Sequence, residues 1–160
     1  MSTAASTPNQ RRERSAVQTV ALVVGIVFLL VGVAGFIPGL TTDMSGMDMA
    51  GHTSDSMLMG LFQVSVLHNI VHLLFGIAGV LFSRTARAAR NYLVWGGVIY
   101  LVLWIYGLIV GNDDRAANFV PLNTADNWLH LFLGVGMLLL GLLLPRAVAG
   151  SARGTRAQAR

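Results

Sequence analysis

Four long apolar runs limit most strongly how this chain folds. They cover residues 17–37, 57–82, 92–110 and 127–144. None contains a Lys, Arg, Asp or Glu, and about 20 apolar residues are enough for a helix to cross the hydrocarbon layer of a bilayer. Charged residues make up 11% of the chain, against roughly 25% in soluble domains. The sequence therefore predicts an all-α protein, an integral membrane four-helix bundle over residues 17–145, with disordered tails at 1–16 and 146–160.

The basic residues indicate how the helices are oriented. All 11 are Arg, and only Arg115 lies outside the two tails and the connection between the second and third runs. Because Arg in short loops is retained on the cytoplasmic side, we expect both termini in the cytoplasm and the chain in the plasma membrane of a bacterial cell. The arginines are scattered over three short segments, so the expected partner is the lipid bilayer and not nucleic acid.

The sequence also excludes several kinds of chemistry. There is no cysteine, so disulfides, thiol redox chemistry and thiolate metal sites are excluded. The chain has no G-x-S-x-G, phosphate loop, H-E-x-x-H or pair of carboxylates within an apolar run. We therefore expect a protein that is not an enzyme.

A short pattern that occurs twice indicates an internal duplication. The pattern N-x-x-H-L-x-x-G covers residues 69–76 and 127–134, near the outer ends of two helices that run in the same direction. Glycines recur 72 residues apart in the other two runs, in the pairs Gly25 with Gly97 and Gly35 with Gly107. We expect a tandem duplication of one two-helix hairpin, with the halves related by an axis along the membrane normal.

Small residues recur at helical spacing in all four runs. Lipid gives helices no hydrophobic reason to associate, so close approach at small residues and interhelical hydrogen bonds must hold a bundle together. We expect the glycine-rich faces inside the bundle and the Leu, Ile, Val and Phe faces against lipid. The same glycine-rich faces could instead join copies of the chain into a homo-oligomer.

Polar side chains at membrane depth are costly unless paired, so they mark a candidate site. The candidates are His68, His72, His130, Asn69 and Asn127. His68 and His72 are four residues apart and share one helix face, which His130 is expected to approach from the fourth helix. Neutral imidazoles suit Zn or Cu, and haem is a further candidate. Two other roles stay open: hydrogen bonds that fix the register of the helices, and a path for protons or a small solute.

The connection between the first two runs is rich in methionine. Its candidate ligands are Met44, Met47, Met49 and His52. Thioether sulfur selects Cu(I), and spaced methionines with a histidine in an extracytoplasmic loop resemble the copper-scavenging segments of copper-resistance proteins. The alternative is a flexible loop whose methionines bind nothing.

The residues before the fourth run predict how that helix begins. Asn123 or Thr124 is expected to accept a hydrogen bond from the free amides of the first turn. Asp126 suits the positive end of the helix dipole. We expect structural roles for all three.

Three segments resemble a family of small bacterial membrane proteins. They are GVAGFIPG at 32–39, LFQVSVLHNIVHL at 61–73 and NFVPLNTADNWLH at 118–130. The family is catalogued as domain of unknown function 4383, and the resemblance covers roughly residues 17–144. It implies a four-helix membrane protein and brings no established activity, and the methionine-rich stretch at 44–49 is not part of the shared pattern. We expect a non-enzymatic structural or interaction protein of the cell envelope, with metal or haem binding, or a solute path, as alternatives.

Overall fold

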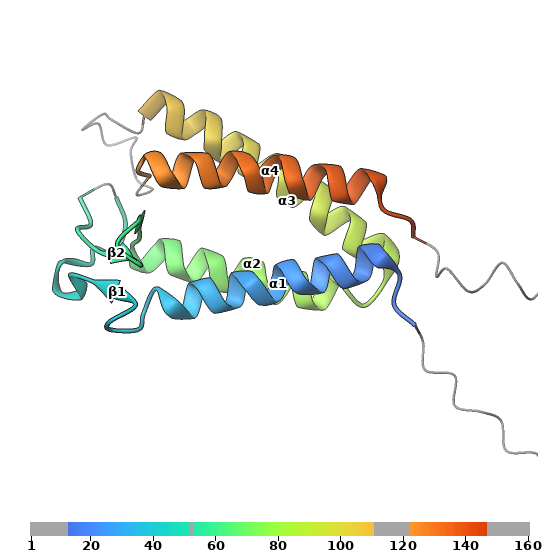
Figure 1. Ribbon diagram of the computed structural model, residues 1–160, viewed down its shortest axis with the longest axis horizontal. Coiled ribbons are helices and arrows are strands. Elements are labelled where there is room, and N and C mark those ends of the chain that lie inside the picture. Colours follow the sequence, from blue (N-terminus) through green and yellow to red (C-terminus); the bar gives the residue numbers. More distant parts are fainter. Residues whose placement is uncertain (1–12, 52, 111–121, 147–160) are drawn as a thin grey trace, which may run out of the picture.

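The described part of the chain folds into four α-helices that run alternately in opposite directions. The protein's structure, a computed structural model, describes residues 13–51, 53–110 and 122–146, so the predicted tails lie almost wholly outside the described residues. The helices are α1 (Ala16–Ala34), α2 (Val66–Phe82), α3 (Ala86–Val110) and α4 (Thr124–Leu143) (Figure 1). α1, α3 and α4 are each long and apolar enough to cross a membrane, and α2 is a shorter apolar helix of 17 residues. The expected all-α membrane protein is confirmed.

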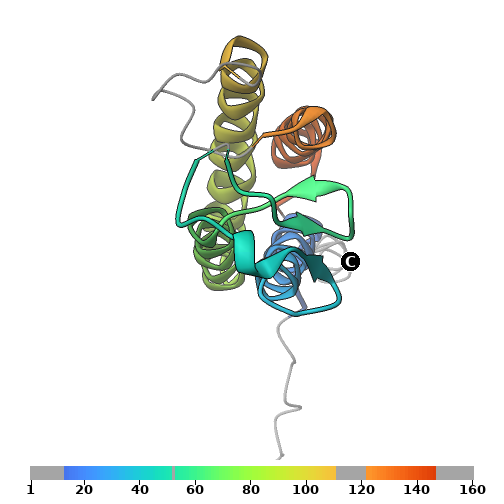
Figure 2. The same cartoon turned by 90° about the vertical axis from the view of Figure 1, so that its left-hand side faces the viewer.

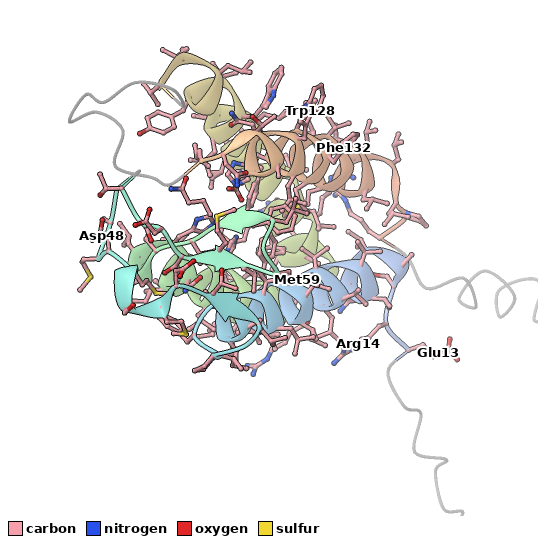
Figure 3. All side chains as sticks on the ribbon, turned by 60° about the vertical axis from the view of Figure 1, so that its left-hand side comes forward. Glu13, Arg14, Asp48, Met59, Trp128 and Phe132 are labelled. Atoms are coloured by element: carbon pink, nitrogen blue, oxygen red, sulfur yellow. The ribbon has the colours of Figure 1, made fainter. Side chains whose placement is uncertain are left out.

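The outward faces of the helices are apolar. Leu30 on α1 is 64% exposed, Ile109 on α3 is 73% exposed and Leu143 on α4 is 76% exposed. Trp128 and Phe132 point away from the bundle on α4 (Figure 3). Soluble monomers rarely expose continuous apolar surface on this scale, so these faces suit contact with lipid.

The four helices associate as two hairpins. α1 packs along α2 and α3 packs along α4, whereas the hairpins meet mainly through α1 and α3. Glycines bring the backbones within each hairpin together. A Cβ on Gly25 would lie 2.7 Å from the backbone nitrogen of Val80, and a Cβ on Gly97 would lie 2.7 Å from that of Leu138. These contacts are related by the offsets of the sequence repeat, which supports the tandem duplication.

α2 and α4 begin at equivalent residues. Ser65 caps α2 because its Oγ accepts a hydrogen bond from the His68 N–H at 3.2 Å. Asn123 caps α4 because its Oδ1 accepts one from the Asp126 N–H at 2.9 Å. Ser65 and Asn123 are 58 residues apart, as are the two N-x-x-H patterns. The cap predicted at Asn123 is present, and it extends α4 beyond the apolar run so that Asp126 lies within the helix.

The second helix is shorter than the sequence predicts. A small antiparallel sheet takes the place of its expected first residues, with the strands β1 (Thr41–Thr42), β2 (Met57–Leu58) and β3 (Phe62–Gln63) paired in that order. Between β2 and β3, Met59 and Gly60 have φ of 54° and 66°. Positive φ at both central residues makes a tight reversal that no helix accommodates. α2 therefore begins at Val66 and not at residue 57.

The connection between α1 and α2 covers one end of the first hairpin (Figure 2). We call residues 35–65 the loop cap. Besides the sheet it contains a short 3₁₀ turn, Met44–Gly46. β3 reaches α4, so the loop cap touches both hairpins.

Two other helix limits differ from the predicted ones. α3 begins at Ala86 and not at residue 92, with Thr85 Oγ1 accepting a hydrogen bond from the Ala88 N–H at 3.2 Å. α1 ends at Ala34 and not at residue 37, where the chain turns into the loop cap. Hydropathy does not mark such limits, because local hydrogen bonds decide where a helix starts and stops.

Opposite the loop cap, a glutamine joins the ends of α1 and α2. Gln18 Nε2 donates hydrogen bonds to the carbonyl oxygens of Ser83 at 3.1 Å and Arg84 at 3.0 Å. These carbonyls follow the last turn of α2, where backbone acceptors lack partners within the helix. The contact holds the start of α1 beside the end of α2.

Candidate functional site

The three histidines predicted at membrane depth lie together between the hairpins. His68 and His72 come from α2 and His130 comes from α4, and they are 9%, 8% and 3% exposed. The ring centroids of His68 and His72 are 4.5 Å apart, and those of His68 and His130 are 6.5 Å apart. We call these three residues the histidine cluster.

Aromatic rings surround the histidine cluster in a repeated arrangement. The ring of Phe28 lies 5.5 Å from that of His72, and the ring of Tyr100 lies 5.2 Å from that of His130. Phe28 and Tyr100 also stack on each other at 5.5 Å. They are 72 residues apart, the offset of the glycine repeat, so Phe28 beside His72 in the first hairpin corresponds to Tyr100 beside His130 in the second. Sequence reasoning missed Phe28 and Tyr100, although this offset could have found them.

One nitrogen of each histidine lacks the hydrogen bond that a structural role would use. The Nδ1 atoms of His68, His72 and His130 are buried and have no hydrogen-bond partner in the described structure. A buried polar atom left without a partner costs about 1–3 kcal/mol. The interhelical hydrogen bonds considered from the sequence are not formed at these atoms. The cluster therefore holds three nitrogen atoms whose bonding capacity the protein leaves unused.

Asn69 and Asn127 lie apart from the histidine cluster. A Cβ on Gly35 would overlap the side chain of Asn69, and a Cβ on Gly107 would overlap that of Asn127. Each asparagine thus packs against the other helix of its own hairpin. Both Oδ1 atoms are buried without a conventional partner among the described residues, and each is the heavy atom nearest to the position that a Cβ on its glycine would take, where a weak Cα–H···O contact is available. The asparagines therefore belong to the hairpin packing.

Asp126 occupies the position in the second hairpin that His68 occupies in the first. Each is the third residue of its helix, and Asp126 is 2% exposed. Its Oδ2 atom accepts hydrogen bonds from the backbone N–H of Gln63 at 3.0 Å and of Asn123 at 3.2 Å. The Asn123 side chain also donates to the carbonyl oxygen of Leu61 at 2.7 Å. The bonds to Gln63 and Leu61 fasten the loop cap to α4, a role that the helix-dipole argument did not anticipate.

The methionine-rich segment is fastened to the first turn of α2. The carbonyl oxygens of Asp48 and Met49 accept hydrogen bonds from the N–H groups of Val66 at 3.1 Å and Leu67 at 2.9 Å. With the Ser65 cap, these bonds satisfy the first free amides of the helix. The backbone of the segment therefore has a structural role, which leaves the methionine side chains to be considered separately.

The candidate loop ligands are spread from the surface towards α2. Met49 is 71% exposed, and Met44 opens the 3₁₀ turn. Met47 is half-buried, and its Sδ lies 4.0 Å from Asn69 Nδ2, which donates a weak hydrogen bond to it. His52 lies outside the described residues. Among the described residues, no contact brings the side chains of these methionines together.

The histidine cluster is not a finished metal site as it stands. Within the described residues, no three His, Cys, Asp or Glu side chains converge closely enough to hold an ion. Imidazoles that share a tetrahedral zinc ion, with nitrogen–metal distances of about 2 Å, hold their ring centroids about 5 Å apart. The observed separations of 4.5 Å and 6.5 Å lie on either side of that value. A haem between them would displace the stacked rings of Phe28 and Tyr100.

Two similar glycine-packed hairpins with histidines buried between them define a helical membrane protein with an internal duplication. The chain belongs to the family catalogued as domain of unknown function (DUF4383), whose match covers residues 18–143. The resemblance seen in the sequence is therefore confirmed, and the match includes the histidine cluster and the loop cap. No curated protein and no solved structure gives a significant match.

Proposed function

We propose that this protein is a non-enzymatic membrane protein that binds a small ligand at the histidine cluster. The observation that carries the proposal is the state of the three Nδ1 atoms, which are buried and unpartnered in the part of the chain that the structure describes. Apolar rings would fill the same space without this penalty. Stability given up at a buried polar group is typical of residues kept for function.

Other residues already perform the structural tasks that the histidines could have had. The backbones of each hairpin meet at glycines such as Gly25 and Gly97, and Asn69 and Asn127 pack inside the hairpins. Asp126 joins the loop cap to α4. A structural or interaction role in the cell envelope, the first expectation from the sequence, would account for the packing of the imidazoles on Phe28 and Tyr100 but not for their unpartnered Nδ1 atoms.

The interior beyond the cluster favours a closed site over a path for protons or solutes. Towards the end of the bundle opposite the loop cap, Val17, Ala21, Ala89 and Leu93 are each 0% exposed and form one apolar core. A path across the membrane would need polar groups or water at this level. The cluster is therefore proposed to exchange its ligand with the side that carries the loop cap.

The distribution of charge supports placing the loop cap outside the cell. The helix ends opposite the loop cap are the start of α1, the α2–α3 connection and the end of α4 (Figure 1). All the described arginines lie at or near these ends: Arg14, Arg84, Arg87, Arg90 and Arg146. By the positive-inside rule, that end faces the cytoplasm of a plasma-membrane protein. A reporter that works only in the cytoplasm should be active when it is fused at residues 83–85. A reporter that works only outside the cell should be active when it is inserted in the loop cap. The reverse pattern would contradict the orientation.

Replacement of each histidine by phenylalanine separates a binding role from a structural one. Because the substitution removes an unpartnered buried nitrogen worth about 1–3 kcal/mol, we expect H68F, H72F and H130F to unfold in lipid nanodiscs at the same temperature as the wild type or higher. Phe28→Leu, which removes a ring from the same core, should lower the unfolding temperature and shows that the assay senses this region. If the three histidine variants lose as much stability as Phe28→Leu, the histidines are structural and the proposal fails.

A further inference from the structure

We infer that the turn between β2 and β3 is a membrane contact, with the side chains of Met59 and Leu61 among the lipid chains of the leaflet on the loop-cap side. Met59 is 75% exposed and Leu61 is 53% exposed. We call residues 59–61 the loop edge. Lipid contact at the loop edge does not depend on ligand binding at the histidine cluster.

α2 is too short to cross the hydrocarbon layer by itself. At 1.5 Å per residue, its 17 residues span about 26 Å, against a hydrocarbon thickness of about 30 Å. Arg84 follows α2 by two residues and is exposed, so one border of the hydrocarbon lies near the end of α2. The other border therefore falls beyond the start of α2, at the level of the loop cap.

The residues around the loop edge are as apolar as a membrane helix but do not form one. Leu58 is buried, whereas Met59 and Leu61 face outward. Met59 also has a φ of 54°, a conformation that residues other than glycine seldom adopt. No charged residue lies between Asp55 and Arg84. This part of the loop cap therefore suits lipid better than water.

The loop edge continues the lipid-facing surface of α1. Val33 near the end of α1, and Ile37 and Leu40 after it, are 49%, 41% and 45% exposed. The Met59 N–H donates a hydrogen bond to the Leu40 carbonyl oxygen at 2.7 Å, which holds the loop edge beside these side chains. Figure 2 shows the turn between β2 and β3 projecting sideways from the bundle and not along its axis. Exposed apolar side chains thus follow one another from α1 to the loop edge.

The backbone of the loop edge is paired in the way that nearby lipid requires. Polar backbone groups that face hydrocarbon need partners within the protein. The N–H groups of Met59 and Leu61 donate to the carbonyl oxygens of Leu40 at 2.7 Å and Leu58 at 3.1 Å. The Leu61 carbonyl oxygen accepts a hydrogen bond from the Asn123 side chain at 2.7 Å. With these groups paired, the loop edge can lie at the border of the hydrocarbon.

Spin labels on single cysteines test the contact. The chain has no cysteine, so Met59→Cys, Met49→Cys and Leu30→Cys each create one labelling site in the full chain. Electron paramagnetic resonance in lipid nanodiscs measures how often each label collides with oxygen, which concentrates in lipid, and with a water-soluble nickel chelate.

The two reference positions bracket the expected result. Met49 is the matched control, because it is a loop-cap methionine with 71% exposure and follows the charged residue Asp48. Leu30, on the lipid-facing side of α1, is 64% exposed. We expect the ratio of oxygen collisions to nickel collisions at residue 59 to be several-fold higher than at residue 49 and close to that at residue 30.

Three results would overturn the inference. A ratio at residue 59 equal to that at residue 49 would place the loop edge in water. A label at residue 59 that neither reagent reaches would show that a second copy of the chain or another protein covers it. A ratio that stays the same in short-chain lipid would also contradict lipid contact, because a thinner hydrocarbon layer should withdraw from residue 59 before it uncovers residue 30. Leu61→Cys, at a residue without positive φ, keeps the test decisive if Met59→Cys does not fold.

Discussion

The two hairpins share one framework, and one buried position near the loop cap where they differ separates their tasks. In both, glycines bring the helix backbones together, an asparagine packs on a glycine of the other helix, and a histidine lies beside an aromatic ring. His72 of the first hairpin corresponds in this way to His130 of the second. One turn earlier the correspondence ends, because His68 in α2 is matched by Asp126 in α4.

This difference shows how two similar halves come to have separate tasks. His68 adds a third imidazole to the space between the hairpins. Asp126 instead accepts backbone hydrogen bonds and holds the loop cap of the first hairpin against the second. With histidine at both positions the loop cap would lose this anchor. The repeated positions thus build the bundle. At the pair that differs, His68 adds to the site and Asp126 holds the loop cap over it.

The largest loss of stability is expected from substitutions at the glycines that the two hairpins share. Gly25→Ala and Gly97→Ala each place a Cβ 2.7 Å from a backbone nitrogen of the neighbouring helix, which cannot move aside as a side chain can. Each substitution should lower the free energy of unfolding by about 2–3 kcal/mol, as overpacking does, measured by denaturant unfolding in micelles. Gly136→Ala is the matched control, because no heavy atom lies within 4 Å of its Cβ. A loss in only one hairpin would contradict their equivalence.

A smaller loss of stability is expected at Asp126, where the hairpins differ. Asp126→Ala leaves two backbone N–H groups without their acceptor and should lower the free energy of unfolding by about 1–3 kcal/mol. Hydrogen exchange at the Gln63 amide should also become faster. Asp126→His, which makes the second hairpin match the first, should destabilise the loop cap in the same way. Asp55→Ala, at an exposed carboxylate of the loop cap, controls for loss of charge. If hydrogen exchange at the Gln63 amide is unchanged in Asp126→Ala, the Asp126 carboxylate does not hold the loop cap in place.

The smallest effects are expected at the two helix caps. Ser65→Ala removes one side-chain acceptor at the start of α2 and should cost about 1 kcal/mol. Asn123→Ala should cost more, because Asn123 also donates to the Leu61 carbonyl and so joins α4 to the loop cap. Thermal unfolding of the two variants, with Ser45→Ala at an exposed serine as the control, measures the difference. Equal losses at the two caps would argue against this added contact.

The candidate site was predictable in part from the sequence. Spacing placed His68 and His72 on one face, and the repeat brought in His130 from α4. Polarity at membrane depth grouped Asn69 with the histidines in the prediction, but neighbouring residues on a helix do not face the same partner. Phe28 and Tyr100 were not predicted as part of the site, because ring packing against a histidine on another helix leaves no local pattern.

By itself, the sequence determined that this is a membrane protein of four helices in two related hairpins. That much is local physics: in hydrocarbon the backbone must satisfy its hydrogen bonds within each helix, so an apolar run of sufficient length specifies a span. Only the tertiary structure decided that α2 begins at Val66, that the asparagines and histidines have different neighbours, and that Asp126 anchors the loop cap. These features depend on strands, caps and acceptors supplied by segments far away in the chain, and no local pattern encodes such partners.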